Sequence, residues 1–425
     1  MNFDKSSRTQ TSLSVLTLLT GTGIAQAILI SVSPILTRIY SPEDFGTFAT
    51  YSAIVAILAV ISTGRYELAI VSPKKETDAA NVVVLCLSIS VVLSILSYLL
   101  IQTFGYSLVK ALGNSEIQEL LYLLPISLLL TGFYQTLNYW NTRKEVYKNI
   151  ASSSVAISGS SATMQIILGI GVSQPNGLVV GSVSGQGVGA FSLYMLSRTE
   201  FLNSIRNSSI HGILKNAKRY KDFPLFSSGA SLINNIATQL PVFVITSAFG
   251  VTVTGIYSLT IRILSAPLTL FSSAIFQVFF KKITTISIEK PEDLQKYVLN
   301  TFLLLVLFGS PLVALMIFWG PMIFSIVFGD EWVEAGEIAG LLSIVAVVRF
   351  AISPLSAVFS LENNVKRGAF WQLLYFVSLA SLFYFIYDLD FNFFLMLYVI
   401  HEVILYGVFL FLILRSSKHR KYMTN

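Results

Sequence analysis

The stretch Ala79–Phe104, AANVVVLCLSISVVLSILSYLLIQTF, runs for 26 residues without a charged side chain. The hydrocarbon core of a bilayer is about 30 Å thick, and an α-helix needs about 20 apolar residues to cross it. Lipid cannot hydrogen-bond an exposed backbone, so a run of this length has to be helical. The stretch therefore predicts a transmembrane helix.

The rest of the chain has a similar composition. Of its 425 residues, 54% are hydrophobic and 12% are charged, whereas an ordinary globular domain carries about 25% charged residues. Such a chain could not cover its surface with polar groups in water, which excludes a soluble enzyme. With one cysteine, Cys86, and three histidines, we expect no intramolecular disulfide, no metal site and no cofactor.

Twelve apolar runs of spanning length can be distinguished along the sequence. They are Leu13–Leu36, Phe45–Thr63, Ala79–Phe104, Leu120–Trp140, Ile150–Val172, Gly177–Ser197, Leu225–Phe249, Gly255–Phe280, Val298–Trp319, Gly336–Ser360, Ala369–Tyr387 and Asn392–Leu414. We therefore predict an all-α integral membrane protein of about twelve transmembrane helices. The outer connections are short, such as 173–176 and 250–254, and leave no room for an extramembrane catalytic domain.

Lysine and arginine are distributed unevenly between the two sides. If the N-terminus is cytoplasmic, the cytoplasmic side collects 24 of the 28 basic residues. The opposite side keeps only Arg38 and Lys110, beside ten acidic residues. Because cytoplasmic loops carry an excess of basic residues, we predict that both termini are cytoplasmic. Topology then explains the net charge of +6, and no nucleic-acid partner is expected.

The predicted spans divide into two sets of six. We expect an N-terminal six-helix lobe, 1–197, a cytoplasmic linker, 198–224, a C-terminal six-helix lobe, 225–414, and a basic cytoplasmic tail, 415–425. Two short echoes, about 207 to 209 positions apart, support a repeat: Pro34-Ile-Leu with Pro241-Val-Phe, and Phe45-Gly-Thr-Phe with Gly255-Ile-Tyr-Ser. Because six is even, such repeats would be parallel, as in two-lobed transporters that bind substrate between the lobes. The alternative is chance similarity among apolar segments.

Two arginines lie inside predicted spans, where a charge costs about 2.5–3.5 kcal/mol and normally faces a cavity or a partner. Arg262 shares a helical face with Ser258, Ser265, Thr269 and Ser272, and Arg349 precedes Ser353, Ser356 and Ser360. Span seven adds a stripe around Asn235, made of Ser228, Ser231 and Thr238. These stripes predict a hydrated, cationic cavity for an anionic substrate, since a guanidinium matches phosphate geometry.

The alternative interpretation is that the stripes serve helix packing and that an arginine pairs with Glu402. Glu402 is the only carboxylate well inside a span, and it is either a protonation site for ion coupling or a counter-ion. The adjacent His401 points about 100° away around the helix, so the two do not form a dyad. Gly181, Gly185 and Gly189 form a small-residue ladder that predicts a helix contact.

Several motifs are dispersed over the whole chain. They are Pro34-Ile-Leu-Thr-Arg-Ile-Tyr-Ser-Pro-Glu-Asp-Phe-Gly, Gly64-Arg-Tyr-Glu-Leu-Ala-Ile-Val, Tyr220-Lys-Asp-Phe-Pro, Gly255-Ile-Tyr, Arg262-Ile-Leu-Ser-Ala-Pro267 and Phe328-Gly-Asp-Glu-Trp. In these motifs the chain resembles the oligosaccharide flippases of the multidrug/oligosaccharidyl-lipid/polysaccharide exporter superfamily. Among them, the Wzx-type O-antigen and polysaccharide translocases are the most similar.

The resemblance implies a flippase that moves undecaprenyl-pyrophosphate-linked oligosaccharide repeat units from the cytoplasmic to the periplasmic leaflet by alternating access. It implies a multi-pass protein of the bacterial cytoplasmic (inner) membrane that acts in O-antigen or surface polysaccharide biosynthesis. Membrane lipids, a polysaccharide polymerase and a chain-length regulator are expected partners of a monomeric protein. The resemblance also gives Arg65 and Glu67, which position alone makes interfacial anchors, a functional role.

Other functions remain open at this stage. A small-molecule or drug cation antiporter of the same superfamily would be expected to carry more acidic groups inside the membrane. A polysaccharide polymerase or ligase would need a large outer loop, and a structural role in an assembly complex is a third alternative. Because no nucleotide-binding loop is present, an ion gradient, the membrane potential or product removal has to drive transport.

Overall fold

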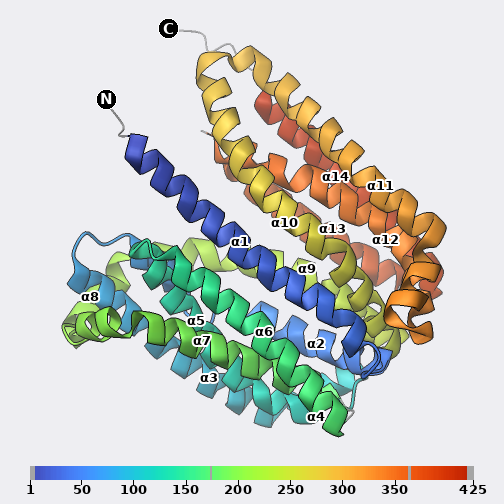
Figure 1. The fold of residues 1–425 in the computed structure, drawn as a ribbon, viewed down its shortest axis with the longest axis horizontal. Helices are drawn as coiled ribbons and strands as arrows, with labels where there is room; N and C mark the ends of the chain where they lie inside the picture. Colours follow the sequence, from blue (N-terminus) through green and yellow to red (C-terminus); the bar gives the residue numbers. More distant parts are fainter. Residues whose placement is uncertain (1–4, 173–174, 362–364, 419–425) are drawn as a thin grey trace. The chain divides into compact units, whose positions relative to one another are not determined.

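The computed structural model describes residues 5–172, 175–361 and 365–418, and every regular element in these ranges is a helix. Its contacts divide the chain into two compact units, Met1–Gly255 and Ile256–Asn425, drawn in Figure 1 from blue to red along the sequence. This division falls at Gly255, and the lobes predicted from the sequence, 1–197 and 225–414, stay a prediction. Each unit is described separately below.

Unit 1 contains nine α-helices and three short 3-10 or π turns among its described residues. They are α1 (Lys5–Leu36), α2 (Pro42–Ala59), η1 (Tyr66–Val71), α3 (Glu76–Leu112), α4 (Ile117–Leu120), η2 (Leu121–Leu123), α5 (Leu124–Arg143), α6 (Tyr147–Val172), α7 (Pro175–Ile205), α8 (Ile210–Arg219), η3 (Phe223–Ser227) and α9 (Ser228–Phe249). The first turn of α10 also belongs to this unit.

Unit 2 contains five α-helices and three 3-10 turns in the described part of the chain. They are α10 (Val251–Glu289), η4 (Pro291–Asp293), α11 (Leu294–Phe328), η5 (Asp330–Trp332), α12 (Val333–Ile352), η6 (Ser353–Ser360), α13 (Val365–Ile386) and α14 (Phe391–Ser417). The predicted basic tail, 415–425, lies outside the described residues from position 419 onward.

Ten helical segments in the described ranges are long and apolar enough to cross a membrane. The other two predicted spans correspond to α2, which has 18 residues, and to α13, which contains the apolar helix Phe370–Ile386. The all-α membrane fold with about twelve spans is therefore confirmed. The predicted loop 250–254 is wrong, because α10 begins at Val251. Gly250, with a φ of 90°, is the single residue between α9 and α10.

Small residues allow the helices of unit 1 to pack closely. Helix α6 lies between α1 and α7 (Figure 1). A Cβ at Gly185 of α7 would lie 1.8 Å from the Ser161 hydroxyl of α6, and Gly181 and Gly189 also face α6. The predicted contact role of this glycine ladder is thus confirmed. Close backbone approach matters here because lipid gives helices no hydrophobic reason to associate.

A second close approach joins α2 to the first turn of α10, inside unit 1. A Cβ at Gly46 would lie 1.9 Å from the Val251 carbonyl oxygen, and one at Gly255 would lie 1.8 Å from the Pro42 carbonyl oxygen. Gly46 and Gly255 are equivalent positions in the sequence echo. Each glycine therefore packs against the backbone of the helix that carries the other.

Three buried threonine hydroxyls extend this contact one turn further. The hydroxyl of Thr246 on α9 lies 3.1 Å from that of Thr50 on α2 and 3.0 Å from that of Thr254 on α10. Helix α9, the first span of the predicted C-terminal lobe, is thereby held against α2. We call this set, Gly46, Thr50, Thr246, Thr254 and Gly255, the α2–α9 contact.

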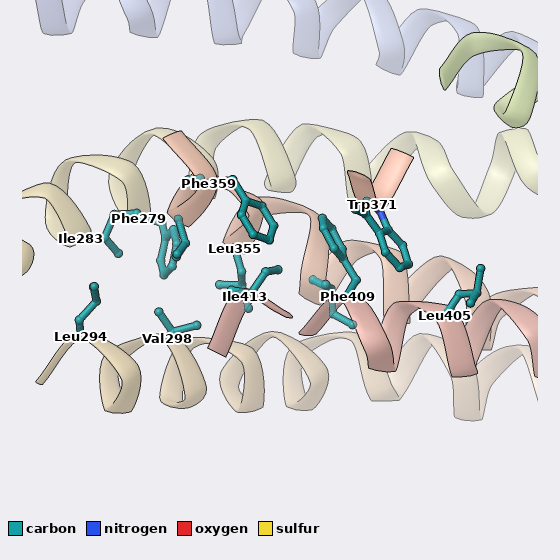
Figure 2. Close-up of a cluster of buried hydrophobic side chains, with 13 residues drawn as sticks. Phe279, Ile283, Leu294, Val298, Leu355, Phe359, Trp371, Leu405, Phe409 and Ile413 are labelled. Carbon is teal, nitrogen blue, oxygen red and sulfur yellow. The ribbon is translucent and has the colours of Figure 1, made fainter. Parts of the chain in front are cut away.

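The hydrophobic core of unit 2 gathers near the ends of α10 and α14 (Figure 2). Phe409 stacks with two other rings. Its centroid lies 4.4 Å from that of Trp371 and 5.6 Å from that of Phe359. Tyr406 meets Trp371 edge-on at 6.1 Å. The rigid aromatic cluster thus supports the part of α14 that carries the polar residues described below.

The glycine ladder gives a test of this packing. Gly185→Ala should lower the free energy of unfolding by about 1–3 kcal/mol, the usual effect of overpacking, as measured by denaturant unfolding in detergent micelles. The matched control is Gly187→Ala on the same helix, where the nearest atom to a Cβ is 3.7 Å away. A Gly185→Ala protein as stable as the control would contradict the close α6–α7 contact.

Candidate functional site

Arg349 and Glu402 form a charged pair inside unit 2. Arg349 is the last-turn arginine of α12, and Glu402 lies mid-way along α14. The Glu402 Oε2 atom accepts from Nη2 of Arg349 at 2.6 Å and from Nε at 2.9 Å. The Glu402 side chain is completely buried, whereas 30% of the Arg349 side chain is exposed. The pair is therefore one-sided, with its acid inside and its base at a surface.

Three tyrosines surround this pair, and the sequence interpretation missed them. The Tyr375 hydroxyl donates to Glu402 Oε1 at 2.7 Å, and Arg349 Nη2 donates to the hydroxyls of Tyr375 and Tyr398 at 3.0 and 3.2 Å. The ring of Tyr406 lies 5.8 Å from the guanidinium carbon. Tyr398, Glu402 and Tyr406 recur every four residues on one face of α14, a signal that could have revealed them.

A cavity of about 610 Å³ opens beside Arg349, between α10, α12 and η6. Its polar lining combines two of the predicted stripes with one residue that the sequence interpretation missed, Gln277. The polar lining residues are Ser265, Thr269, Ser272, Gln277, Arg349 and Ser353. The structure thus places Arg349 and Ser265, which belong to separate stripes, in the lining of one cavity.

The predicted serine stripe below Arg349 has a different geometry from the one expected. The segment Ser353–Ser360 is a 3-10 helix, with Pro354 in its first turn, so α12 ends at Ile352. A proline ring cannot follow an α-helical interior without loss of a backbone bond. Ser353 lines the cavity, whereas the Ser356 hydroxyl bonds back to the Ser353 carbonyl at 2.7 Å.

The other predicted residues of the C-terminal half lie elsewhere. Arg262 is partly exposed, one turn before Ser265 on α10, but it is not among the described residues that line the cavity. The Ser258 hydroxyl is buried and finds no hydrogen-bond partner in the described part of the chain. Asn235 belongs to unit 1 and donates to the Ser231 carbonyl of its own helix at 3.0 Å.

Unit 1 carries a second one-sided pair, Arg65 and Glu67. Glu67 is buried, accepts a hydrogen bond from the Thr63 hydroxyl, and lies 3.4 Å from Arg65 Nη1. Arg65 is 23% exposed in its side chain and donates from Nε and Nη2 to the Ser227 hydroxyl at 3.3 and 3.2 Å. The functional role that the resemblance gives to Arg65 and Glu67 stays a prediction.

The backbone at this pair is unusual. Gly64 and Arg65 both have left-handed conformations, with φ values of 60° and 64°, which turn the chain sharply between α2 and η1. For a residue with a side chain this conformation costs about 1–2 kcal/mol, and such strain clusters at functional sites.

His401 does not belong to the Arg349 site, as predicted from its position on the helix. Its Nε2 atom lies 2.8 Å from the Ser378 hydroxyl of α13. Among the described residues, no group of three or more His, Cys, Asp or Glu side chains could hold a metal ion.

The comparisons with known proteins agree with this architecture. Residues 35–337 match the family described as "Polysaccharide biosynthesis protein", and this match covers more than half of the chain. The chain belongs to this polysaccharide biosynthesis family. The resemblance predicted from the dispersed motifs is thereby confirmed at the level of the family.

Two curated proteins similar to this chain are named for the biosynthesis of polysaccharides. Succinoglycan biosynthesis transport protein ExoT of Rhizobium meliloti (strain 1021) is 27% identical over 80% of this chain and 67% of its own length. Teichuronic acid biosynthesis protein TuaB of Bacillus subtilis (strain 168) is 24% identical over 40% of this chain and 35% of its own.

Solved structures of transporters share the fold of this family member. An inward-facing multidrug resistance MATE family transporter of the MOP superfamily matches with a TM-score of 0.67 and 17% identity over 94% of both chains. A MOP superfamily transporter from Pyrococcus furiosus matches with a TM-score of 0.62 and 18% identity over 95% of both chains. The protein therefore is a multi-pass membrane protein with the MOP transporter fold.

The Arg349–Glu402 pair can be tested through stability. Glu402→Ala should lower the free energy of unfolding by about 3–5 kcal/mol, because the Arg349 charge then has no counter-charge in the interior. Replacing both partners, as Arg349→Met with Glu402→Met, should recover most of this loss. Denaturant unfolding in detergent measures each variant.

A surface pair in the same chain serves as the control. Lys144 and Glu76 form a salt bridge at 2.5 Å, with exposed fractions of 25% and 53%. Glu76→Ala should therefore cost no more than about 1 kcal/mol. Equal losses for Glu402→Ala and Glu76→Ala would show that burial does not determine the strength of the pair.

Proposed function

We propose that the protein translocates undecaprenyl-pyrophosphate-linked oligosaccharide repeat units from the cytoplasmic to the periplasmic leaflet of a bacterial inner membrane. Family membership and the transporter fold support membrane transport in polysaccharide biosynthesis. The lipid-linked form of the substrate is the further step. A charged, hydroxyl-rich head group cannot cross hydrocarbon unaided, since each unpaired polar group is costly there.

The observation that carries the proposal is how Arg349 uses its hydrogen-bond donors. Its Nε and Nη2 atoms bind Glu402 and two tyrosines, but no hydrogen bond within the described residues involves Nη1. The cavity lies beside this arginine. While the Nε and Nη2 fork stays on Glu402, the guanidinium can present its two Nη1 N–H groups to a phosphate oxygen as charge-assisted hydrogen-bond donors.

The charge arrangement favours an anionic cargo over a cationic one. A cation antiporter needs carboxylates that can bind its cargo. Glu67 and Glu402 are the buried carboxylates of the described chain, and each already pairs with an arginine. We therefore assign both glutamates as counter-ions, and not as sites of ion coupling.

The remaining predicted residues have supporting roles in this proposal. Ser265 would contact the head group or sugar in the cavity beside Arg349, and Arg262 and Ser258 would extend the polar face one and two turns further along α10. Arg65 and Asn235 would offer a second polar surface in unit 1. These contacts are proposals that rest on position, exposure and residue type.

Alternating access is the second part of the proposal. The α2–α9 contact joins the predicted N-terminal lobe to the first span of the predicted C-terminal lobe, at the end expected to face the periplasm. In this proposal its close backbone packing is the contact that holds that end shut. For a substrate to leave on that side, α2 has to separate from α9 and from the first turn of α10.

Transport can be tested in a strain that lacks the gene. Deletion should abolish the surface polysaccharide and trap single repeat units on undecaprenyl pyrophosphate at the cytoplasmic leaflet, as measured by glycan analysis and mass spectrometry of lipid extracts. Intact polymer together with new drug sensitivity would instead support the antiporter.

Complementation of that strain tests Arg349. The Arg349→Met, Glu402→Met double variant should reach the membrane in normal amounts but restore less than a tenth of the polymer, because it folds without presenting a cation. Arg349→Lys should restore export only partly, since an ammonium lacks the fork. Ser356→Ala, outside the cavity lining, is the matched control. Normal export by the double variant would refute the role of Arg349.

Alternating access can be tested by crosslinking. In a Cys86→Ser background, Thr50→Cys with Thr246→Cys should form a disulfide across the α2–α9 contact and stop export until a reductant is added. The control pair, Thr47→Cys with Asn114→Cys, joins residues of the N-terminal lobe whose side chains lie 3.3 Å apart. Crosslinking the control with a short thiol reagent should leave export intact. Export by the locked Thr50–Thr246 pair would contradict the required separation.

A further inference from the structure

The segment between α7 and α9, predicted as a plain linker, contains an amphipathic helix. Helix α8 has the sequence IHGILKNAKR, and the Ser209 hydroxyl caps its N-terminus by accepting from the Gly212 N–H at 3.1 Å. From Arg206 to Lys221 the chain has five lysines and arginines and no acidic residue.

One face of α8 is fixed to the first turns of α3. The buried Asn216 side chain donates to Asp78 at 3.2 Å, and the Ser209 N–H donates to the Asn81 side chain at 3.0 Å. The Tyr66 hydroxyl donates to the Ala217 carbonyl at 3.0 Å. These contacts hold α8 at the level of the membrane where the apolar run of α3 begins.

A second face of α8 is apolar and uncovered. Ile210 and Leu214, one turn apart, are 79% and 60% exposed. Leu225 and Phe226, in the π turn that leads into α9, are 67% and 77% exposed. In a chain that spans a membrane, large apolar side chains at the boundary of the spans are suited to the upper part of the hydrocarbon layer.

The third face of α8 is basic. Lys215 and Arg219 are exposed and lie about 140° and 180° around the helix from Ile210. Lys218 and Lys221 are also exposed. The only ion pair of these residues in the described chain is a long one, 3.9 Å, between Arg219 and Asp78. Most of this positive charge is thus available to an external anionic surface.

We propose that α8 lies in the cytoplasmic interface of the bilayer and binds anionic phospholipid head groups. Ile210, Leu214 and Phe226 insert among the acyl chains, and Lys215, Lys218 and Arg219 contact the phosphates. Basic residues beside an apolar face are the pattern by which helices bind anionic leaflets. A protein partner would have to match both faces, whereas the lipid interface supplies both and already adjoins the helix.

Depth measurements on the intact protein test this inference. Single cysteines at Leu214 and Lys215, adjacent residues on different faces, are placed in a Cys86→Ser background and spin-labelled. Because Cys86 is completely buried, the native background can be used if that replacement impairs folding. The purified proteins are placed in nanodiscs of phosphatidylcholine with one quarter phosphatidylglycerol. Collision rates with oxygen, which partitions into lipid, and with a water-soluble nickel chelate are then compared.

The label at Leu214→Cys should collide at least threefold less with the nickel chelate and more with oxygen than the label at Lys215→Cys. This difference should shrink in discs of phosphatidylcholine alone, and also in a Lys218→Gln, Arg219→Gln variant in anionic discs. Equal nickel accessibility at the two positions in anionic discs would overturn the proposal. Protection of Leu214→Cys from both reagents would also overturn it, because protein and not lipid would then cover the face.

Discussion

A carboxylate that is buried away from water needs a counter-charge beside it, and both units meet this constraint in the same way. Glu402 and Glu67 are almost completely buried, and each lies within ion-pair distance of an arginine. In both pairs the glutamate is the buried member and the arginine reaches a surface. The cost of desolvation is thereby limited to a carboxylate that has its counter-charge and hydroxyl donors around it.

This asymmetry is what the proposed role of Arg349 requires. A fully enclosed ion pair would be inert, whereas an arginine held from one side keeps donors for a ligand on the other. Glu402 and the hydroxyls of Tyr375 and Tyr398 hold the Arg349 guanidinium through its Nε and Nη2 atoms. An anion entering the cavity would then meet a cation that needs little reorganisation. The second arginine, Arg65, is held by Glu67 and by the Ser227 hydroxyl.

The sequence predicted the spans well and the site only in part. Span positions follow from local composition, because hydrocarbon demands an apolar surface and a helical backbone from each segment separately. The pairing of Arg349 with Tyr375 and Glu402 joins residues 26 and 53 positions apart, and no local pattern reports which helices touch. Pro354 can be read from the sequence, but the sequence does not show that α12 ends at Ile352. Nor does it show that the serine stripe Ser353–Ser360 continues as a 3-10 helix. Helix α8 was overlooked because its charges were attributed only to topology.

The contact between Gly46 and Gly255 also restricts how the chain can vary. Because each glycine faces the backbone of the other's helix, a larger residue at either position disturbs the same few atoms, and the effects of two substitutions cannot be additive.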